Sequence, residues 1–225
     1  MLKSRDPDQG KYSAGSLDHQ APRLRFPASL TARALIQKAA VAPEGRDPMC
    51  IIESSPVIET RRLSLRAPGA QDTSRIAAMA NDPGIARMTQ RMPHPFTLHD
   101  AEAFVLQVAS QDPRRASTFV IEHEDHGPVG VIGMFEDEDR VPETGYWIGR
   151  DYWGRGYATE ALEGALAWAS RHWKRRAMVA GHFADNPASG RVLEKAGFLY
   201  TGETRRTFSR ARGGLTETRR MVWLA

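Results

Sequence analysis

The sequence has little cysteine, with one residue, Cys50, in a chain of 225. A single thiol has no partner for an internal disulfide, which is consistent with a reducing compartment, and we expect a cytoplasmic protein. A catalytic thiol needs a neighbouring base and an electropositive setting, and the residues around Cys50 provide neither. The sequence therefore argues against a covalent intermediate on cysteine.

The chain also lacks long apolar runs and paired metal ligands. No apolar run reaches membrane-spanning length, and residues 1–7 contain an acid and a proline and lead into no apolar stretch, unlike a signal peptide. The seven histidines form no paired ligand motif, and His123 and His126 flank an acidic turn of a predicted hairpin, where turn chemistry explains their polarity. We therefore expect a soluble protein with no metal and no membrane partner.

The N-terminal part differs in composition from the rest of the chain. Up to about Pro48 it is rich in Pro, Gly, Ser, Arg and Asp, with one short apolar patch at residues 34–41. Such a stretch buries too little surface to offset its conformational entropy, so we predict a disordered extension over residues 1–55 and a single domain over 56–225. Met49 lies just ahead of this domain, which suggests that translation starts there. A tryptic peptide from residues 24–38 of the native protein would refute that hypothesis.

The glycine-containing loop at residues 152–160 joins a predicted strand to a predicted helix. The strand ends in aromatic and β-branched residues at 145–148, and alanines and leucines then recur at helical spacing up to residue 169. The first N–H groups of a helix lack intrahelical partners and lie at the positive end of its dipole, which favours a phosphate. Gly154 and Gly156 allow a close approach of the backbone, and Arg155 adds a charged donor. A steric role for the glycines explains the loop equally well.

A second strand, loop and helix follow at residues 177–196. Asn186 and Ser189 lie in the turn between the predicted strand 177–183 and the predicted helix 190–196. Gly197 is well placed to end that helix, with Lys195 in the last turn, where a cation suits the dipole.

This order of motifs resembles the GNAT superfamily of acetyl-CoA-dependent N-acetyltransferases, in particular the ribosomal-protein N-terminal alanine acetyltransferases. The resemblance extends from about residue 58 to the C-terminus, and residues 59–66, 81–83 and 92–97 are similar to the first strand, substrate-side helices and connector of that branch. It implies an α/β (α+β) fold with a mixed, mostly antiparallel central sheet flanked by helices. It also implies acetyl-CoA as cosubstrate, an amine acceptor, and a monomer or homodimer.

The resemblance also implies which residues bind the cosubstrate. The pyrophosphate would rest on the loop and first helical turn, and backbone amides would stabilise the oxyanion near two residues of the preceding strand. Asn186 would contact the pantetheine arm, in a gap between two central strands. The cosubstrate-binding candidates are Trp147, Ile148, Gly154, Arg155, Gly156, Tyr157, Ala158, Thr159 and Asn186.

Two residues are candidates for proton transfer. By resemblance, Glu143 would draw the proton from the amine, through water, and Ser189 would protonate the departing thiolate. Both have structural alternatives, because acids are common in the loop before Glu143, and Asn186 and Ser189 are favoured capping residues. The chain departs from the family at Leu193, where many members have a tyrosine that acts as the acid. Tyr200 and water are therefore further candidates for this role.

A further departure is Asp151, which stands three residues before Gly154, where many GNAT enzymes have Gln or Arg; we expect this carboxylate to point away from phosphate.

The acceptor stays open between three hypotheses: a protein N-terminal amine, a small-molecule amine, or a non-catalytic module that only binds acyl-CoA. The substrate side is expected between residues 83 and 108, with four lining candidates that could equally be core. These are Met88, Met92, Phe96 and Phe104.

Charge bears on the choice of partner. The chain has a net charge of +4, and arginines gather in a predicted C-terminal hairpin. Because acids interrupt this cluster and no run of stacking aromatics accompanies it, steering of an acidic substrate is favoured over nucleic-acid binding.

Overall fold

The computed structural model describes residues 56–136 and 140–225, and the predicted N-terminal extension with Met49 and Cys50 lies outside them. The strands are β1 (Ile58–Glu59), β2 (Leu63–Arg66), β3 (Ala116–His123), β4 (Gly127–Glu136), β5 (Pro142–Ile148), β6 (Ala177–Phe183), β7 (Leu199–Ser209) and β8 (Gly214–Leu224). The α-helices are α2 (Thr73–Ala80), α3 (Pro83–Ala86), α4 (Leu98–Ala109), α5 (Tyr157–His172) and α6 (Pro187–Lys195). Two short 3-10 helices are η1 (Ala70–Asp72) and η2 (Arg150–Tyr152).

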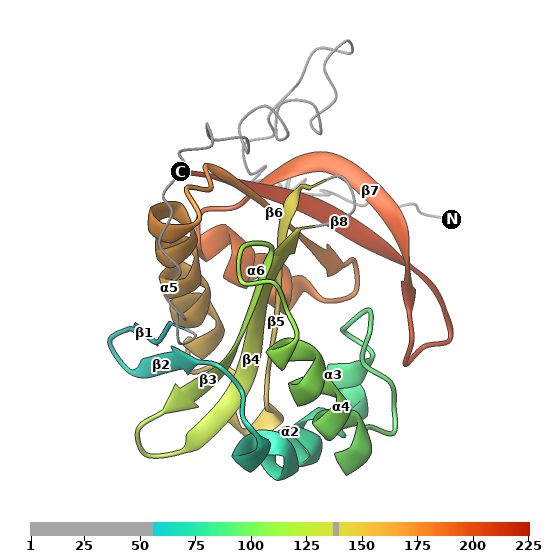
Figure 1. Cartoon of the computed structure of the whole chain (residues 1–225). Coiled ribbons are helices and arrows are strands. Elements are labelled where there is room, and N and C mark those ends of the chain that lie inside the picture. The colour runs from blue at the N-terminus through green and yellow to red at the C-terminus, as the bar shows by residue number, and fades with distance from the viewer. Residues whose placement is uncertain (1–55, 137–139) are drawn as a thin grey trace, which may run out of the picture.

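The strands form one sheet in the order β1-β2-β3-β4-β5-β6-β8-β7 (Figure 1). All neighbouring pairs are antiparallel except β5 and β6, which are parallel and are connected through α5. A parallel pair needs a long crossover, and the amphipathic helix after the glycine loop provides it. The predicted fold class, a mixed and mostly antiparallel sheet flanked by helices, is confirmed.

Helices cover both faces of the sheet. One face packs against α5 and α6 in the main core, to which α5 contributes the alanines and leucines whose spacing predicted a helix. The other face packs against α2 and α4 through a smaller cluster around Ile76, Ala101 and Val120. Successive residues of a strand alternate between these two faces, so each strand position faces one helical layer only.

The two parallel strands separate almost at once. β5 pairs with β4 over its whole length, from Pro142 to Ile148, but it pairs with β6 only at Glu143 and Val179. Beyond that point, the N–H and C=O groups of β5 that face β6 form no strand ladder with it. The expected parting of two central strands is therefore present.

The C-terminal hairpin extends past the rest of the sheet. β8 pairs with β6 along its second half, whereas β7 forms the outer edge and pairs with β8 (Figure 1). The hairpin tip reaches back to the segment after α3, because Ser209 Oγ donates to Thr89 O over 3.0 Å and Arg210 N donates to Gln90 O over 2.9 Å.

Candidate active site

The glycine loop has the local structure that the sequence predicts. β5 ends at Ile148, and α5 begins at Tyr157 with Gly156 as its N-cap. Gly154 and Gly156 have φ values of +76° and +81°, a region that strongly favours glycine. No atom lies within 4 Å of a Cβ added at Gly154, so bulk at that position would project into open space. Arg155 is exposed, Ala158 and Thr159 are half-buried, and Tyr157 is buried in the core.

A carboxylate in the first turn of α5 places a further cation beside this loop. Glu160 Oε1 accepts from Thr60 Oγ1 over 2.9 Å and from Arg62 N over 2.7 Å, while Glu160 Oε2 accepts from Arg62 Nε over 2.7 Å. Burial raises the pKa of Glu160, but these hydrogen bonds lower it by more, so the net shift is downward. The Arg62 guanidinium lies 4.8 Å from the centroid of the Tyr157 ring and borders Gly156.

The turn between β3 and β4 also flanks the loop. The predicted hairpin is present, and the His123 and His126 rings stack with centroids 4.6 Å apart. Arg155 Nη1 lies 3.4 Å from His126 Nε2, and its guanidinium is 5.8 Å from the centroid of the Tyr152 ring. The loop therefore has basic side chains from three segments around it, of which the sequence indicated only Arg155.

Glu143 lies where β5 and β6 part and forms an ion pair with β8. Arg220 Nη1 donates to Glu143 Oε1 over 2.8 Å, and both side chains are largely buried. Glu143 and Trp147 are four residues apart on β5 and so share a face, and Trp147 packs against the cluster between the sheet and α2 and α4. The Glu143 carboxylate is thus on the side of the sheet that carries α2 and α4. Ile148 is buried in the opposite core, and its carbonyl accepts from Trp153 Nε1 over 2.6 Å.

Ser189 contacts the other face of β5. Asn186 Oδ1 accepts from Ser189 N over 3.2 Å, so Asn186 caps α6. Capping is the structural alternative to a role of Asn186 in cosubstrate binding. The Ser189 and Tyr146 hydroxyl oxygens lie 3.0 Å apart, and Tyr146 Oη also donates to Ser189 O over 3.2 Å. Burial raises the pKa of Tyr146 to about 12, although the Ser189 hydrogen bond opposes the shift. Tyr146 stays protonated at neutral pH, and no motif in the sequence singles it out.

Two further positions bear on the identity of the acid. Leu193, at the position where many family members have a tyrosine, is buried in the main core and has no acidic proton. Tyr200 Oη lies 2.9 Å from His182 Nε2, beneath Gly190 of α6, and burial raises its pKa.

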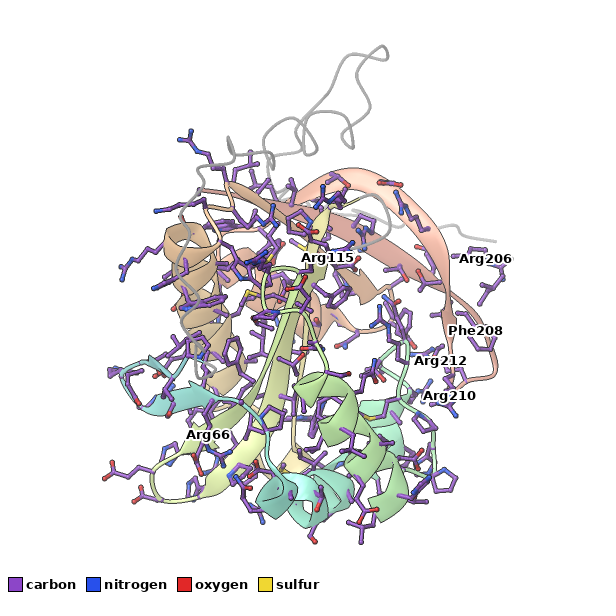
Figure 2. All side chains as sticks on the ribbon, in the orientation of Figure 1. Arg66, Arg115, Arg206, Phe208, Arg210 and Arg212 are labelled. Atoms are coloured by element: carbon purple, nitrogen blue, oxygen red, sulfur yellow. The ribbon has the colours of Figure 1, made fainter. Side chains whose placement is uncertain are left out.

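The acceptor side combines apolar side chains with contacts from the C-terminal hairpin. Phe96 and Phe104 are half-buried and pack against the cluster between the sheet and α2 and α4. Met88 accepts through sulfur from Arg212 Nη2 over 3.4 Å. Arg212 also binds both carboxylate oxygens of Asp185, the residue before Asn186, over 2.8 and 3.0 Å. The hairpin is therefore fastened to both sides of the site, and Figure 2 shows Arg212 near its tip. Met92 is half-buried.

Within residues 56–136 and 140–225, no helix is long and apolar enough to span a membrane, and no three potential ligands are grouped to hold a metal ion.

Family and sequence comparisons agree with this geometry. A family model described as acetyltransferase (GNAT) domain matches residues 62–199. The chain is 28% identical over 154 residues to the uncharacterized N-acetyltransferase YoaA of Bacillus subtilis, which covers 67% of this chain and 86% of that protein. It is 30% identical over 89 residues to the ribosomal-protein-serine acetyltransferase of Escherichia coli, covering 39% of this chain and 49% of that protein. The match to the uncharacterized protein YkkB of Bacillus subtilis, 34% identical over 80 residues, covers 36% of this chain and 46% of that relative.

Solved structures share the fold at lower identity. An acetyltransferase of the GNAT family from Bacillus anthracis superposes with a TM-score of 0.66 at 20% identity, covering 75% of this chain and 98% of that one. RimL, a ribosomal L7/L12 alpha-N-protein acetyltransferase in complex with coenzyme A, gives 0.66 at 15% identity, covering 75% and 98%. Spermidine N-acetyltransferase from Vibrio cholerae, in complex with CoA and spermine, gives 0.60 at 18% identity, covering 72% and 95%.

Proposed function

Because the chain belongs to the acetyltransferase (GNAT) family, we propose that it transfers an acetyl group from acetyl-CoA to a protein N-terminal amine by direct attack of the amine on the thioester. The observation that carries this proposal is the parting of β5 from β6 after Glu143 and Val179, with the glycine loop at the far end of the same strand. A thioester arm lying along the freed edge of β5 would have its phosphates at the start of α5 and its acyl end near Glu143.

The donor side would use backbone groups and nearby cations. The pyrophosphate would accept from the amides of residues 154–159, with Arg62 and Arg155 supplying positive charge beside the loop. Asn186 would contact the pantetheine arm while it caps α6. Amides of the freed edge, near Trp147 and Ile148, would stabilise the oxyanion of the tetrahedral intermediate.

The amine would approach from the other face, where Glu143 lies. Glu143 would receive its proton, directly or through a water, and the pair with Arg220 would hold the carboxylate in place. A protein α-amino group has a pKa near 8, compared with about 10.4 for lysine, so a base that acts through water would suffice. The C–N bond forms as the tetrahedral intermediate is made, the C–S bond breaks when that intermediate collapses, and the departing thiolate must then gain a proton.

That proton would come from the hydroxyl pair of Ser189 and Tyr146 on the donor face. Tyr146 carries its proton at neutral pH, since an ordinary tyrosine pKa is already far above 7 and burial raises that of Tyr146 to about 12, and it lies within hydrogen-bond distance of the Ser189 hydroxyl. Ser189 would pass its proton to the thiolate and regain one from Tyr146. The pair would thus replace the tyrosine acid that many family members have at the position of Leu193.

The charge around Glu143 favours a protein acceptor over a polyamine. Arg220 contacts the Glu143 carboxylate. Phe135 is the residue of β4 that pairs with Glu143, and the Arg91 guanidinium lies 4.7 Å from the centroid of the Phe135 ring. These cations would repel a second ammonium group on the acceptor. The chain also aligns with a ribosomal-protein-serine acetyltransferase, although over 49% of that protein.

The first test is calorimetric titration of acetyl-CoA into the full chain and into Gly156→Trp. Gly213→Trp is a matched control, because Gly213 also has a positive φ, +64°, but lies in the hairpin turn. We expect micromolar binding to the wild type and the control, and its loss in Gly156→Trp. Absence of binding to a folded wild type would refute the proposal. Competition between a peptide with a free N-terminus and a diamine for acetyl groups then separates the two classes of acceptor.

A further inference from the structure

The outer edge of β7 is an open strand edge. β7 is the last strand of the sheet and, within the described part of the chain, its ladder is formed with β8 alone. Four of the five residues from Thr204 to Phe208 are exposed, and the fifth, Thr207, is half-buried. Since successive side chains of a strand point to opposite faces, neither face of this stretch is covered by a helix.

The side chains on this ribbon combine apolar surface with positive charge. Phe208 is 55% exposed, and Leu215, its partner across the ladder, is 54% exposed. Residues 199–225 contain six arginines and two glutamates, a net charge of +4 that equals the net charge of the whole chain. Figure 2 shows Arg206, Phe208 and Arg210 along the outer end of the hairpin.

We propose that the edge of β7 at Thr204–Phe208 docks an extended acidic segment of a partner protein, which adds to the sheet as a further strand. The open edge offers main-chain N–H and C=O groups, as in other cases of strand addition. Acidic side chains of the added strand would pair with Arg205 and Arg206. An apolar side chain at an alternate position would cover Phe208 and Leu215.

A second copy of this chain fits the same edge poorly. Two copies that pair through β7 about a twofold axis would place the same stretch of each strand side by side. Arg205 and Arg206 of one copy would then lie close to the same residues of the other, and like charges on neighbouring strands are destabilising.

A nucleic acid also fits less well. It has no peptide backbone to continue the ladder of β7 and would leave the main-chain groups of that edge unpaired. Arg205 is also paired with Glu203 over 2.5 Å. An acidic polypeptide uses the backbone edge, the apolar pair and the cations together.

The inference goes beyond the proposed function, because docking on β7 requires no acetyl transfer. The end of the edge at Ser209 is fastened to Thr89 of the segment after α3, beside the acceptor side of the site. An acidic segment held on β7 would therefore emerge at that side.

The test uses the full-length protein and an N-acetylated decapeptide of alternating Glu and Val, which cannot act as an acceptor at its N-terminus. We expect the peptide to bind and to slow amide hydrogen exchange in residues 204–208. A decapeptide of alternating Gln and Val should bind about tenfold more weakly. The variant Arg206→Glu/Phe208→Ala should also lower the affinity for the acidic peptide by roughly tenfold or more. The matched control is Arg171→Glu, at an exposed position in the last turn of α5, and it should leave the affinity unchanged.

Four results would each overturn the inference. These are equal affinity for the two peptides, no protection at β7, stronger protection of the same amides by a single-stranded RNA oligomer, and protection that increases with protein concentration alone. The exchange measurement on the wild type stands even where the double variant does not fold. Acetyl-CoA titration of the double variant should match the wild type, which separates this inference from the proposed function.

Discussion

Glu143→Gln is expected to slow acetyl transfer while it preserves the surrounding structure. The glutamine amide oxygen can still accept from Arg220 Nη1, which lies 2.8 Å from Glu143 Oε1. Loss of a general base typically lowers the rate by about 10² to 10⁴. We expect the lower end, about a hundredfold in kcat at pH 7 or about 2.7 kcal/mol, because roughly a tenth of an α-amino group with a pKa near 8 is already neutral at that pH.

The pH profile distinguishes a chemical effect from a structural one. Without Glu143, the acceptor must lose its proton to solvent before it attacks. The kcat/KM of Glu143→Gln should therefore rise nearly tenfold per pH unit below about pH 8 and level off above it, narrowing the gap to the wild type. The assay follows CoA thiol release with an acceptor peptide between about pH 6 and 9, with thermal unfolding as a check on the fold.

Arg220→Lys is the matched control for this prediction, because it keeps a cation beside the carboxylate and retains the base. Its kcat should stay within about threefold of the wild type. Wild-type kcat in a folded Glu143→Gln variant at pH 7, or a profile parallel to that of the wild type, would refute the role of Glu143.

Two further predictions concern the donor face and the start of α5. Tyr146→Phe and Ser189→Ala should each lower kcat about tenfold with little change in the KM for acetyl-CoA, whereas Tyr200→Phe should keep the wild-type kcat in the same assay; the reverse pattern would assign the acid to Tyr200. Glu160→Gln should lower the free energy of unfolding by about 1 kcal/mol at pH 7, as measured by denaturant titration. Because the folded state lowers the pKa of Glu160, the carboxylate stabilises the protein above its unfolded pKa, and the difference from Glu160→Gln should disappear as the pH falls through the folded pKa. A difference that does not change with pH would contradict the assigned ion pair.

Local signals in the sequence predicted the elements that depend on neighbouring residues. The glycines at 154 and 156 carry the positive φ values that their residue type suggested, and the apolar spacing after them forms the buried face of α5. The helix at α6 begins at Pro187, three residues earlier than predicted, because Asn186 rather than Ser189 provides the cap.

Long-range contacts were beyond the sequence. Arg62 and Glu160 are 98 positions apart, and Glu143 and Arg220 are 77 apart. Only the tertiary fold brings such residues together, and the residues next to them in the sequence do not indicate a partner. Glu160 did carry a weak signal, since an acid in the first turn of a helix suits its dipole.

The alternation of β5 explains why the two proposed proton groups can serve different substrates. Glu143 lies on the face of α2 and α4, and Tyr146, three residues later, lies on the face of α5 and α6, where it meets Ser189. In a continuous sheet, the hydrogen-bonded strands would separate an amine on one face from a thioester on the other face. Here the ladder between β5 and β6 is limited to Glu143 and Val179, so the two reactants can meet through the parted edge beside the base. A one-residue shift of β5 would exchange the two faces and remove both groups from their proposed roles, so the proposed mechanism depends on the register against β4, which pairs with β5 from Pro142 to Ile148.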